Sequence, residues 1–223
     1  RVDRRQRQMC IRDRNKTVLI RFDLNVPLSN ETPISDRITR INKTISNLKK
    51  LNSKIVILSH LGRPKGKINS ELSLKQILPQ LEKALNQKIL FSENCIGEDT
   101  FKKIKEGKNG DIILLENCRF HKEEEENQDE FAKSLSKLAD VYINDAFACS
   151  HRSHASIDAI TKYLPSYCGD LLSEELSNLS EIVKNPAKPS VTIMGGSKIS
   201  SKISILKSLS IKMDTIITVS YTH

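Results

Sequence analysis

The sequence predicts a parallel α/β fold in which strands and helices alternate along the chain. Short apolar runs rich in Val, Ile and Leu recur in it, and such runs are typical of strands buried on both faces of a parallel sheet. Segments with apolar residues three and four positions apart separate these runs, as amphipathic helices do. The connections are short, which favours a doubly wound sheet flanked by helices.

The first expected strand covers residues 17–22, whose sequence TVLIRF is rich in β-forming residues. A helix is expected after a turn-rich stretch, with Ser35 or Asp36 as its N-cap. Its apolar face is formed by Ile38, Ile41, Ile45 and Leu48. Arg37 then lies in the first turn, beside backbone N–H groups that favour an anion.

The alternation of strands and helices continues along the chain. The expected elements are a strand at 54–58, a helix at 73–86, a strand at 88–91, a helix at 98–106, a strand at 111–115, a helix at 128–139, a strand at 141–144 and a helix at 155–163. Pro79 lies inside the helix expected at 73–86 and is expected to kink it, because proline removes a backbone donor.

A second, incomplete α/β domain is expected near the C-terminal end. A long amphipathic helix at 169–189 closes with two prolines, and a strand, a glycine pair, a helix and another strand follow it. The predicted organisation is an N-terminal domain at 15–186 that includes the linking helix and the start of a second domain at 187–218. A non-native or disordered tail is expected at 1–14 and a non-native tail at 219–223.

Composition argues against several classes of protein. No apolar run reaches the roughly 20 residues of a membrane span, and no secretory signal pattern is present. The five cysteines form no C-x-x-C pair, so we expect a cytoplasmic protein with reduced thiols. The acidic run Glu123 to Glu126 is interpreted as a solvated helix entry rather than a metal site.

The net charge of +9 raises the possibility of nucleic-acid binding. Residues 1–14 contain six Arg and two Asp, and without them the net charge falls to +5. The remaining excess lies in scattered lysines and in arginines at the strand ends. Solvated helix faces with an anion pocket are therefore favoured over a nucleic-acid surface.

Four polar motifs follow the ends of expected strands. They are RFDLN at 21–25, SHLGR at 59–63, ENCRF at 116–120 and the NDAF…SHR stretch at 144–152. Because the carboxyl ends of parallel strands share one edge of a sheet, we expect their side chains to converge there. The candidates are Arg21, Asp23, Asn25, His60, Arg63, Arg119, His151 and Arg152. So many cations and amides predict a multiply anionic ligand.

Each side-chain type in this set has a chemical use. Arginine donates paired hydrogen bonds to phosphate or carboxylate, although a lone arginine is more often a surface ion-pair partner. Asp23 and Asn25 suit a ligand hydroxyl. For His60 and His151 we favour ligand hydrogen bonding over acid–base work, since carboxylate and phosphate nucleophiles are already deprotonated. Cys149 is interpreted as a small buried residue rather than a nucleophile.

The segment MGGSKISSKI at 194–203 is a candidate phosphate site. It places Gly195 and Gly196 at a strand-to-helix turn and Lys198 and Lys202 four positions apart. It lacks the Walker A pattern. A tight turn with solvated lysines is an equally good interpretation.

These strings together resemble the phosphoglycerate kinase family, from about residue 16 to residue 218. They are RFDLNVPL, SDRI, SHLGRP, LLENCRFH, LADVYINDAF, SHRSHAS and GGSKISSKI, in that order. The resemblance implies two Rossmann-like halves. It also implies a glycolytic enzyme that reversibly transfers a phosphoryl group from 1,3-bisphosphoglycerate to ADP, giving 3-phosphoglycerate and ATP after hinge closure.

The resemblance also implies roles for individual residues. The triose-binding set would be Asp23, Asn25, Arg37, His60, Arg63, Arg119, His151 and Arg152. Arg37 and Lys198 would be catalytic, and the nucleotide phosphates would be held by Lys198, Lys202, Gly195 and Gly196. Magnesium would arrive with the nucleotide, as Mg-ADP or Mg-ATP, so no protein metal ligand is expected.

Two departures from the family pattern stand out. Ala148, Cys149 and Ser150 occupy a place where the family commonly has Gly-Thr-Ala, and this exchange of small residues is expected to matter little. The family also continues beyond residue 218 into a nucleotide half. We therefore expect a truncated chain, for which the alternative function is an inactive triose-phosphate-binding module. A monomer without nucleic-acid or membrane partners is expected.

Overall fold

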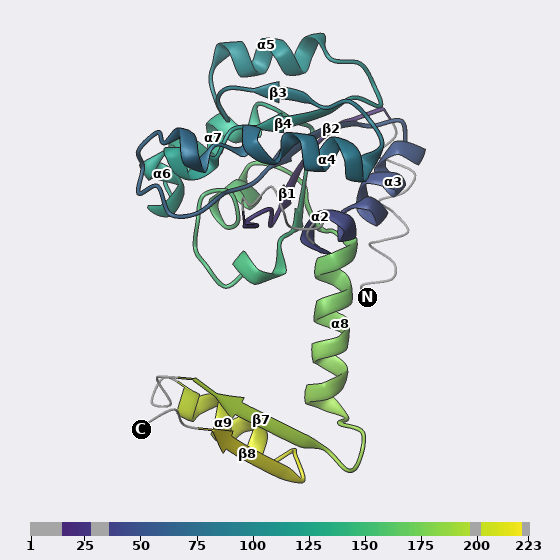
Figure 1. Ribbon diagram of the computed structural model, residues 1–223, viewed down its shortest axis with the longest axis vertical. Helices are drawn as coiled ribbons and strands as arrows, with labels where there is room; N and C mark the ends of the chain where they lie inside the picture. Colours follow the sequence, from purple (N-terminus) through teal and green to yellow (C-terminus); the bar gives the residue numbers. More distant parts are fainter. Residues whose placement is uncertain (1–14, 28–35, 197–201, 220–223) are drawn as a thin grey trace. The chain divides into compact units, whose positions relative to one another are not determined.

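The computed structural model describes residues 15–27, 36–196 and 202–219 (Figure 1). The chain forms two compact units, one ending at Leu172 and the other beginning at Ser173. The division falls inside helix α8 (Asp170–Lys184), which is the helix expected to link two domains. The domain limits given above stay a prediction, because a boundary within a shared helix can be drawn at either of its ends.

The first unit is built on a six-stranded sheet in which every pairing is parallel. The strand order is β3-β4-β2-β1-β5-β6. The strands are β1 (Thr17–Phe22), β2 (Lys54–Leu58), β3 (Leu90–Ser92), β4 (Ile112–Leu115), β5 (Val141–Asp145) and β6 (Ser166–Cys168). This arrangement confirms the predicted α/β class. It also places the switch in strand order beside β1, where open α/β sheets bind ligands.

Helices flank the sheet. The α-helices of the first unit are α2 (Asp36–Arg40), α3 (Asn42–Lys50), α4 (Leu78–Leu85), α5 (Glu98–Glu106), α6 (Lys122–Glu125) and α7 (Asp129–Ser136). Short 3-10 helices lie in the connections: η1 (Ser70–Leu72), η2 (Leu74–Ile77), η3 (Cys118–Phe120), η4 (Phe147–Cys149) and η5 (Ala159–Lys162). Two of these short helices, η3 and η4, come directly after β4 and β5 and belong to the polar motifs at 116–120 and 144–152.

Two large apolar clusters, one on each face of the sheet, form most of the core of the described residues, beside a small third cluster of Ala146, Cys149 and Ile157. Ile20 of β1 belongs to the cluster that contains Ile45 of α3 and Leu81 of α4. Its neighbour Leu19 belongs to the cluster that contains Leu135 of α7. Alternate residues of one strand thus face opposite layers, as the pleat requires. Burying one such aliphatic side chain contributes about 1.5–3 kcal/mol.

Three of the expected helices differ from the structure. The first helix is interrupted at Ile41, so that α2 and α3 replace one continuous helix. Pro79 lies in the first turn of α4, where its missing N–H costs nothing, and it starts that helix instead of kinking it. The helix expected at 155–163 is reduced to η5, because side chains take up the backbone groups of Ser156. Strand β6 was not expected.

The second unit contains most of α8, two parallel strands and one further helix. The strands are β7 (Val191–Gly195) and β8 (Thr215–Val219), and the helix is α9 (Ile203–Ser210). Asp214 ties the start of the sheet together by accepting from the backbone N–H of Ser190 at 2.8 Å and from Lys188 at 2.5 Å. Apolar side chains stay exposed here, and Ile193 is 70% exposed. Within the described ranges no helix is long and apolar enough to cross a membrane.

Candidate functional site

A cavity of about 280 Å³ lies at the carboxyl edge of the six-stranded sheet. It is lined by Asp23, Asn25, Arg37, His60, Gly62, Arg63, Arg119, Ala148, Cys149 and Arg152. We call it the cation pocket, since four guanidinium groups surround it. Every predicted triose-binding residue lines it except His151, which is exposed and does not.

The segment after β1 is fixed to the pocket by short polar contacts. A terminal nitrogen of Arg37 lies 2.6 Å from a carboxylate oxygen of Asp23, and it also donates to the carbonyl oxygen of Asn25 at 3.2 Å. The side-chain oxygen of Asn25 accepts from the backbone N–H of Gly62 at 2.9 Å. Contacts among these four residues therefore hold helix α2 and the loops after β1 and β2 in one arrangement.

Gly62 occupies a position that favours glycine. Its φ is +61°, and a Cβ there would lie 2.7 Å from the Cδ2 atom of Leu72. Its carbonyl oxygen accepts from Arg119 at 2.9 Å while its N–H donates to Asn25. The turn at Gly62 thus positions a pocket residue on each side.

Arg119 is nearly buried, and one of its polar atoms is underused. Its Nε is buried and makes no hydrogen bond, although it forms an ion pair with a carboxylate oxygen of Glu125 at 3.5 Å. Asn117 orders this motif: its side-chain oxygen accepts from the Arg119 N–H, and its amide donates to the carbonyl oxygens of Leu61 and Leu72. Burial lowers the pKa of Arg119, but a guanidinium stays charged in a folded protein. Arg119 therefore gives the pocket a positive charge that can bind an anion.

The last wall of the pocket is the turn after β5. Arg152 is partly exposed and follows η4, which contributes Ala148 and Cys149. Burial raises the pKa of the Cys149 thiol, so the thiol is neutral and poorly nucleophilic. Arg63 is exposed at the rim. This wall supplies charge through Arg152 and close packing through two small side chains.

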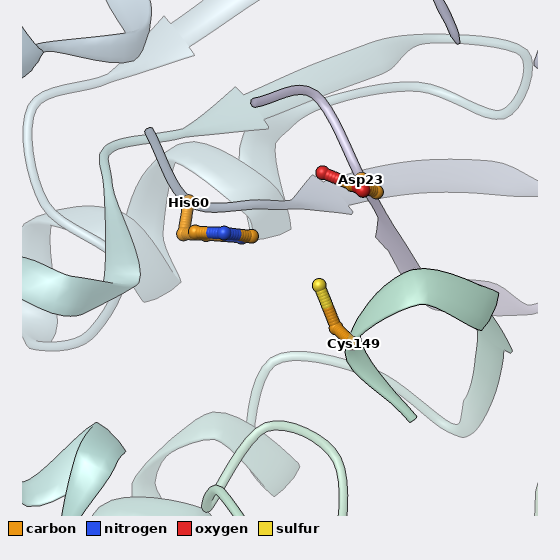
Figure 2. Close-up of side chains that lie close together, drawn as sticks. All are labelled: Asp23, His60 and Cys149. Carbon is orange, nitrogen blue, oxygen red and sulfur yellow. The ribbon is translucent and has the colours of Figure 1, made fainter. Parts of the chain in front are cut away.

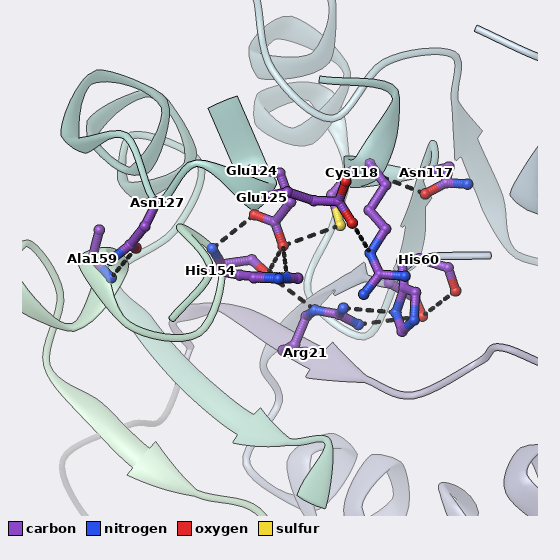
Figure 3. Close-up of polar contacts among 12 residues, drawn as sticks. Arg21, His60, Asn117, Cys118, Glu124, Glu125, Asn127, His154 and Ala159 are labelled. Carbon is purple, nitrogen blue, oxygen red and sulfur yellow. Dashed lines mark hydrogen bonds and ion pairs between the residues drawn. The ribbon is translucent and has the colours of Figure 1, made fainter. Parts of the chain in front are cut away.

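Arg21 was expected at the pocket surface, and that expectation is wrong. It is 1% exposed and lies beneath the pocket, where it contacts Ser156 and His60. Glu124 was expected to be solvated in its acidic run, yet it is fully buried and accepts from the N–H and hydroxyl of Ser156 (Figure 3). No local pattern separates Glu124 from its exposed acidic neighbours, because its partners lie far away in the chain.

The side chains of Asp23, His60 and Cys149 point toward a common space (Figure 2). Their potential ligand atoms all lie within 4.8 Å of one another, so a metal ion must be considered. The surroundings oppose it: Asp23 pairs with Arg37, and the Nδ1 atom of His60 already accepts from Arg21. The four guanidinium groups of the pocket would repel a metal cation, so the cluster fits an anion better.

A larger cavity, of about 390 Å³, lies beside β3 and β4 but lacks this chemistry. Phe91 and Phe120 form its apolar part. Lys75 lines it too, and this lysine lies 3.3 Å from Glu93. Without an excess of positive charge, the larger cavity is a poorer candidate for an anionic ligand.

Comparison with known proteins decides the family. A sequence profile described as phosphoglycerate kinase matches residues 10–221. The chain belongs to the phosphoglycerate kinase family. The match begins and ends inside segments that we expected to be tails, and the nature of those segments stays a prediction.

Curated phosphoglycerate kinases are similar along most of the chain. The enzyme of Wolbachia pipientis subsp. Culex pipiens is 50% identical over 205 residues, which cover 91% of this chain and 51% of that protein. That of Prochlorococcus marinus is 45% identical, again over 91% and 51%. The chain thus spans about half the length of the curated relatives it matches.

Solved phosphoglycerate kinases share the fold. The structure from Coxiella burnetii has a TM-score of 0.78 at 40% identity and covers 92% of this chain and 52% of that chain. The structure from Pyrococcus horikoshii has a TM-score of 0.81 at 32% identity, with 93% and 53% covered. The predicted family and α/β fold are therefore confirmed.

The second candidate site, at the turn after β7, is described only in part. Lys198 lies outside the described residues. The ammonium group of Lys202 donates to the carbonyl oxygen of Gly195. Gly196 has a φ of +124°, and a Cβ there would lie 2.6 Å from the Nζ atom of Lys202. Glycine at this position lets the lysine lie against the turn, but a phosphate role for these residues stays a prediction.

Proposed function

We propose that the protein to which this chain belongs transfers a phosphoryl group reversibly from 1,3-bisphosphoglycerate to ADP, giving 3-phosphoglycerate and ATP in glycolysis. The cation pocket is the observation that carries this proposal. Arg37, Arg63, Arg119 and Arg152 surround a cavity of about 280 Å³ that has a carboxylate and an amide at one side. Membership of the phosphoglycerate kinase family supports the reaction.

The charge of the product fits the pocket. 3-Phosphoglycerate carries a phosphate and a carboxylate, and each can accept paired hydrogen bonds from a guanidinium fork. A hydrogen bond to a charged group contributes about 1.5–3 kcal/mol. Asp23 is placed to accept from the single hydroxyl, and Arg37 contacts the same carboxylate at 2.6 Å. The proposed triose-binding set is therefore the set that lines the cavity, with exposed His151 beside it.

The transfer itself needs positioning and charge neutralisation more than proton transfer. In the direction of ATP synthesis, a β-phosphate oxygen of ADP attacks the acyl phosphate while the bond from phosphorus to the carboxyl oxygen breaks. The attacking oxygen of ADP carries no proton, and the leaving oxygen departs as part of a carboxylate, so no general base is required. We assign the neutralising charges to Arg37 and Lys198. Magnesium would come with the nucleotide as part of that substrate.

The nucleotide phosphates are proposed to bind at Gly195 and Gly196 with Lys202 and Lys198. In the structure Lys202 donates to the Gly195 carbonyl, so it would have to exchange that acceptor for a phosphate oxygen. A charge-assisted bond to phosphate is stronger than a bond to a neutral carbonyl, which favours the exchange.

The second candidate function applies to this chain alone: a module that binds the triose phosphate but does not turn it over. The chain covers about half the length of its relatives, and the described second unit has a sheet of only two strands. Cytoplasmic location and a monomeric state are part of the proposal.

One pair of measurements tests both functions. Calorimetric titration of the 223-residue chain with 3-phosphoglycerate should show binding, and glycerol 3-phosphate, which lacks the carboxylate, should bind more weakly. A coupled assay for ATP formation should show no turnover. Turnover would overturn the binding-module function, and failure of 3-phosphoglycerate to bind would overturn the assigned substrate.

A further inference from the structure

Arg21 is a buried cation that supports the cation pocket from below. Its Nε donates to the hydroxyl of Ser156 at 3.1 Å, and one terminal nitrogen lies 2.8 Å from Nδ1 of His60. The other terminal nitrogen donates to the carbonyl oxygen of Phe22 and, at 3.4 Å, to the hydroxyl of Ser59. Each of the three nitrogens therefore has a defined contact, and the guanidinium plane is fixed.

A serine connects this guanidinium to a buried carboxylate. The Ser156 hydroxyl donates to one oxygen of Glu124 at 2.5 Å, and the Ser156 backbone N–H donates to the other oxygen at 2.9 Å. Because the hydroxyl hydrogen points to Glu124, a lone pair of the same oxygen is free to accept from Arg21. Glu124 is 0% exposed, so the two opposite charges compensate each other through Ser156 in a region without solvent.

The contact with Arg21 decides the protonation of His60. A guanidinium nitrogen can only donate, so Nδ1 must accept and the proton of the neutral ring must be on Nε2. Burial is the main cause that lowers the pKa of His60 to about 2, and nearby positive groups add to this shift: Arg21, Arg119, Arg152 and, when protonated, His154. His60 lines the pocket, and among the described residues none hydrogen-bonds to its Nε2.

We propose that Arg21, held by Ser156 and Glu124, is a positioning residue that fixes His60 as a neutral Nε2–H donor for an anionic oxygen of the pocket ligand (Figure 3). The inference rests on the proposed function, since it assigns that oxygen to the triose phosphate. Arg21 acts only through the imidazole. Its own nitrogens all face protein atoms.

A pH consequence distinguishes this arrangement from an ordinary surface histidine. His60 faces Arg21 of β1, Asp23 of the following loop, Arg119 of η3, and Cys149 and Arg152 around η4. This surrounding charge is mainly positive, so the ring stays neutral where a free imidazole would titrate. The donor is thus present at acidic and at neutral pH alike.

The first test is nitrogen-15 NMR of the imidazole in the ligand-free 223-residue chain. Two-bond proton–nitrogen correlations separate the two neutral tautomers from the imidazolium. We expect His60 as the Nε2–H tautomer throughout pH 5 to 8. A proton on Nδ1, or titration near the usual pKa of about 6.5, would overturn the proposal whether or not the triose phosphate binds.

The second test is a double-mutant cycle with 3-phosphoglycerate titrated by calorimetry. Ser156→Ala removes the bridge between Arg21 and Glu124 and should weaken binding about tenfold, as expected for one misplaced charge-assisted bond. In a His60→Gln background the same substitution should have no further effect. An equal loss in both backgrounds would mean that Ser156 acts on the fold and not through His60.

Ser92→Ala is the matched control, because Ser92 is also buried and its hydroxyl is hydrogen-bonded to Thr100 instead. It should leave the His60 spectrum and the affinity unchanged. Glu124→Gln, which keeps the shape but removes the charge, gives a second route if Ser156→Ala does not fold. If the unsubstituted chain fails to bind 3-phosphoglycerate, the proposed function is wrong, whereas the tautomer result still decides the role of Arg21.

Discussion

Arg37 and Asp23 form an ion pair of 2.6 Å at the edge of the cation pocket, with the arginine side chain half-exposed and the carboxylate largely covered. Such a pair contributes at most about 1 kcal/mol to folding, because water screens the arginine. The arginine is thus held near Asp23 by a contact that contributes little to the stability of the fold. Substitution of Arg37 should therefore change ligand affinity much more than it changes the free energy of unfolding.

Arg37→Ala should weaken binding of 3-phosphoglycerate by about 10- to 100-fold, the equivalent of one charge-assisted contact of about 1.5–3 kcal/mol. The free energy of unfolding should change by less than about 1 kcal/mol. Calorimetry and urea denaturation measure the two quantities. Arg40→Ala, on the same helix but outside the pocket lining, is the control and should keep its affinity. Equal affinities for both variants would place the ligand elsewhere.

Gly62→Ala should destabilise the first unit by at least about 1–3 kcal/mol, because a left-handed residue gains a side chain that also meets Leu72. The affinity for 3-phosphoglycerate should fall as well, since Asn25 and Arg119 both contact this turn. Gly110→Ala is a matched control: its φ is +89°, but no atom lies within 4 Å of the added carbon. If both variants lose affinity equally, the turn at Gly62 has no special role in the pocket.

The stability of the first unit should fall as pH decreases below about 6.5. His60 has its folded-state pKa lowered to about 2, so the unfolded chain binds a proton near its ordinary pKa while the folded chain does not. The free energy of unfolding therefore decreases by at most about 1.4 kcal/mol per pH unit between these values from this group. His121 and His154, whose pKa values burial also lowers, act in the same direction.

Urea denaturation at pH 7.5 and pH 5 measures this slope. His60→Gln should make it shallower, because the substitution removes a group whose protonation the folded chain opposes. A slope unaffected by His60→Gln would show that this ring is protonated in the folded chain.

Hydrogen exchange should be much faster in β7 and β8 than in β1, β2 and β4. A two-stranded sheet with exposed apolar residues such as Ile193 is only marginally stable in water. The central strands of the first unit are buried on both faces. Protection factors should differ by on the order of 100-fold when measured by mass spectrometry. Equal protection would mean that the second unit has stability of its own.

The elements of the fold were largely predictable from local pattern. Strands β1 and β2 were predicted with the observed limits, because apolar runs buried on both faces are unambiguous. The role of Pro79 was misjudged, since a proline inside an apolar pattern is compatible with a kink or with a helix start. The strand β6 was missed because it is short and its outer residues are exposed.

The pocket was predictable from the strand-end rule, but the layer beneath it was not. Asp23, Arg63 and Arg119 follow strands, and the shared edge of a parallel sheet brings them together. Arg21 is the last-but-one residue of β1, and the same rule placed it in the pocket although its side chain is buried. The partnership of Arg21 with Ser156 and Glu124 depends on tertiary packing, which no local spacing encodes.

The four arginines of the cation pocket come from α2, from the loop after β2, from η3 and from the turn after η4, and so from both ends of the first unit. No fragment or half-folded form of this unit can contain a complete binding site. Ligand affinity is therefore a reporter of complete assembly. Any oxyacid that binds there stabilises the folded unit as a whole. At a concentration 100 times its dissociation constant, it raises the free energy of unfolding by about 2.7 kcal/mol.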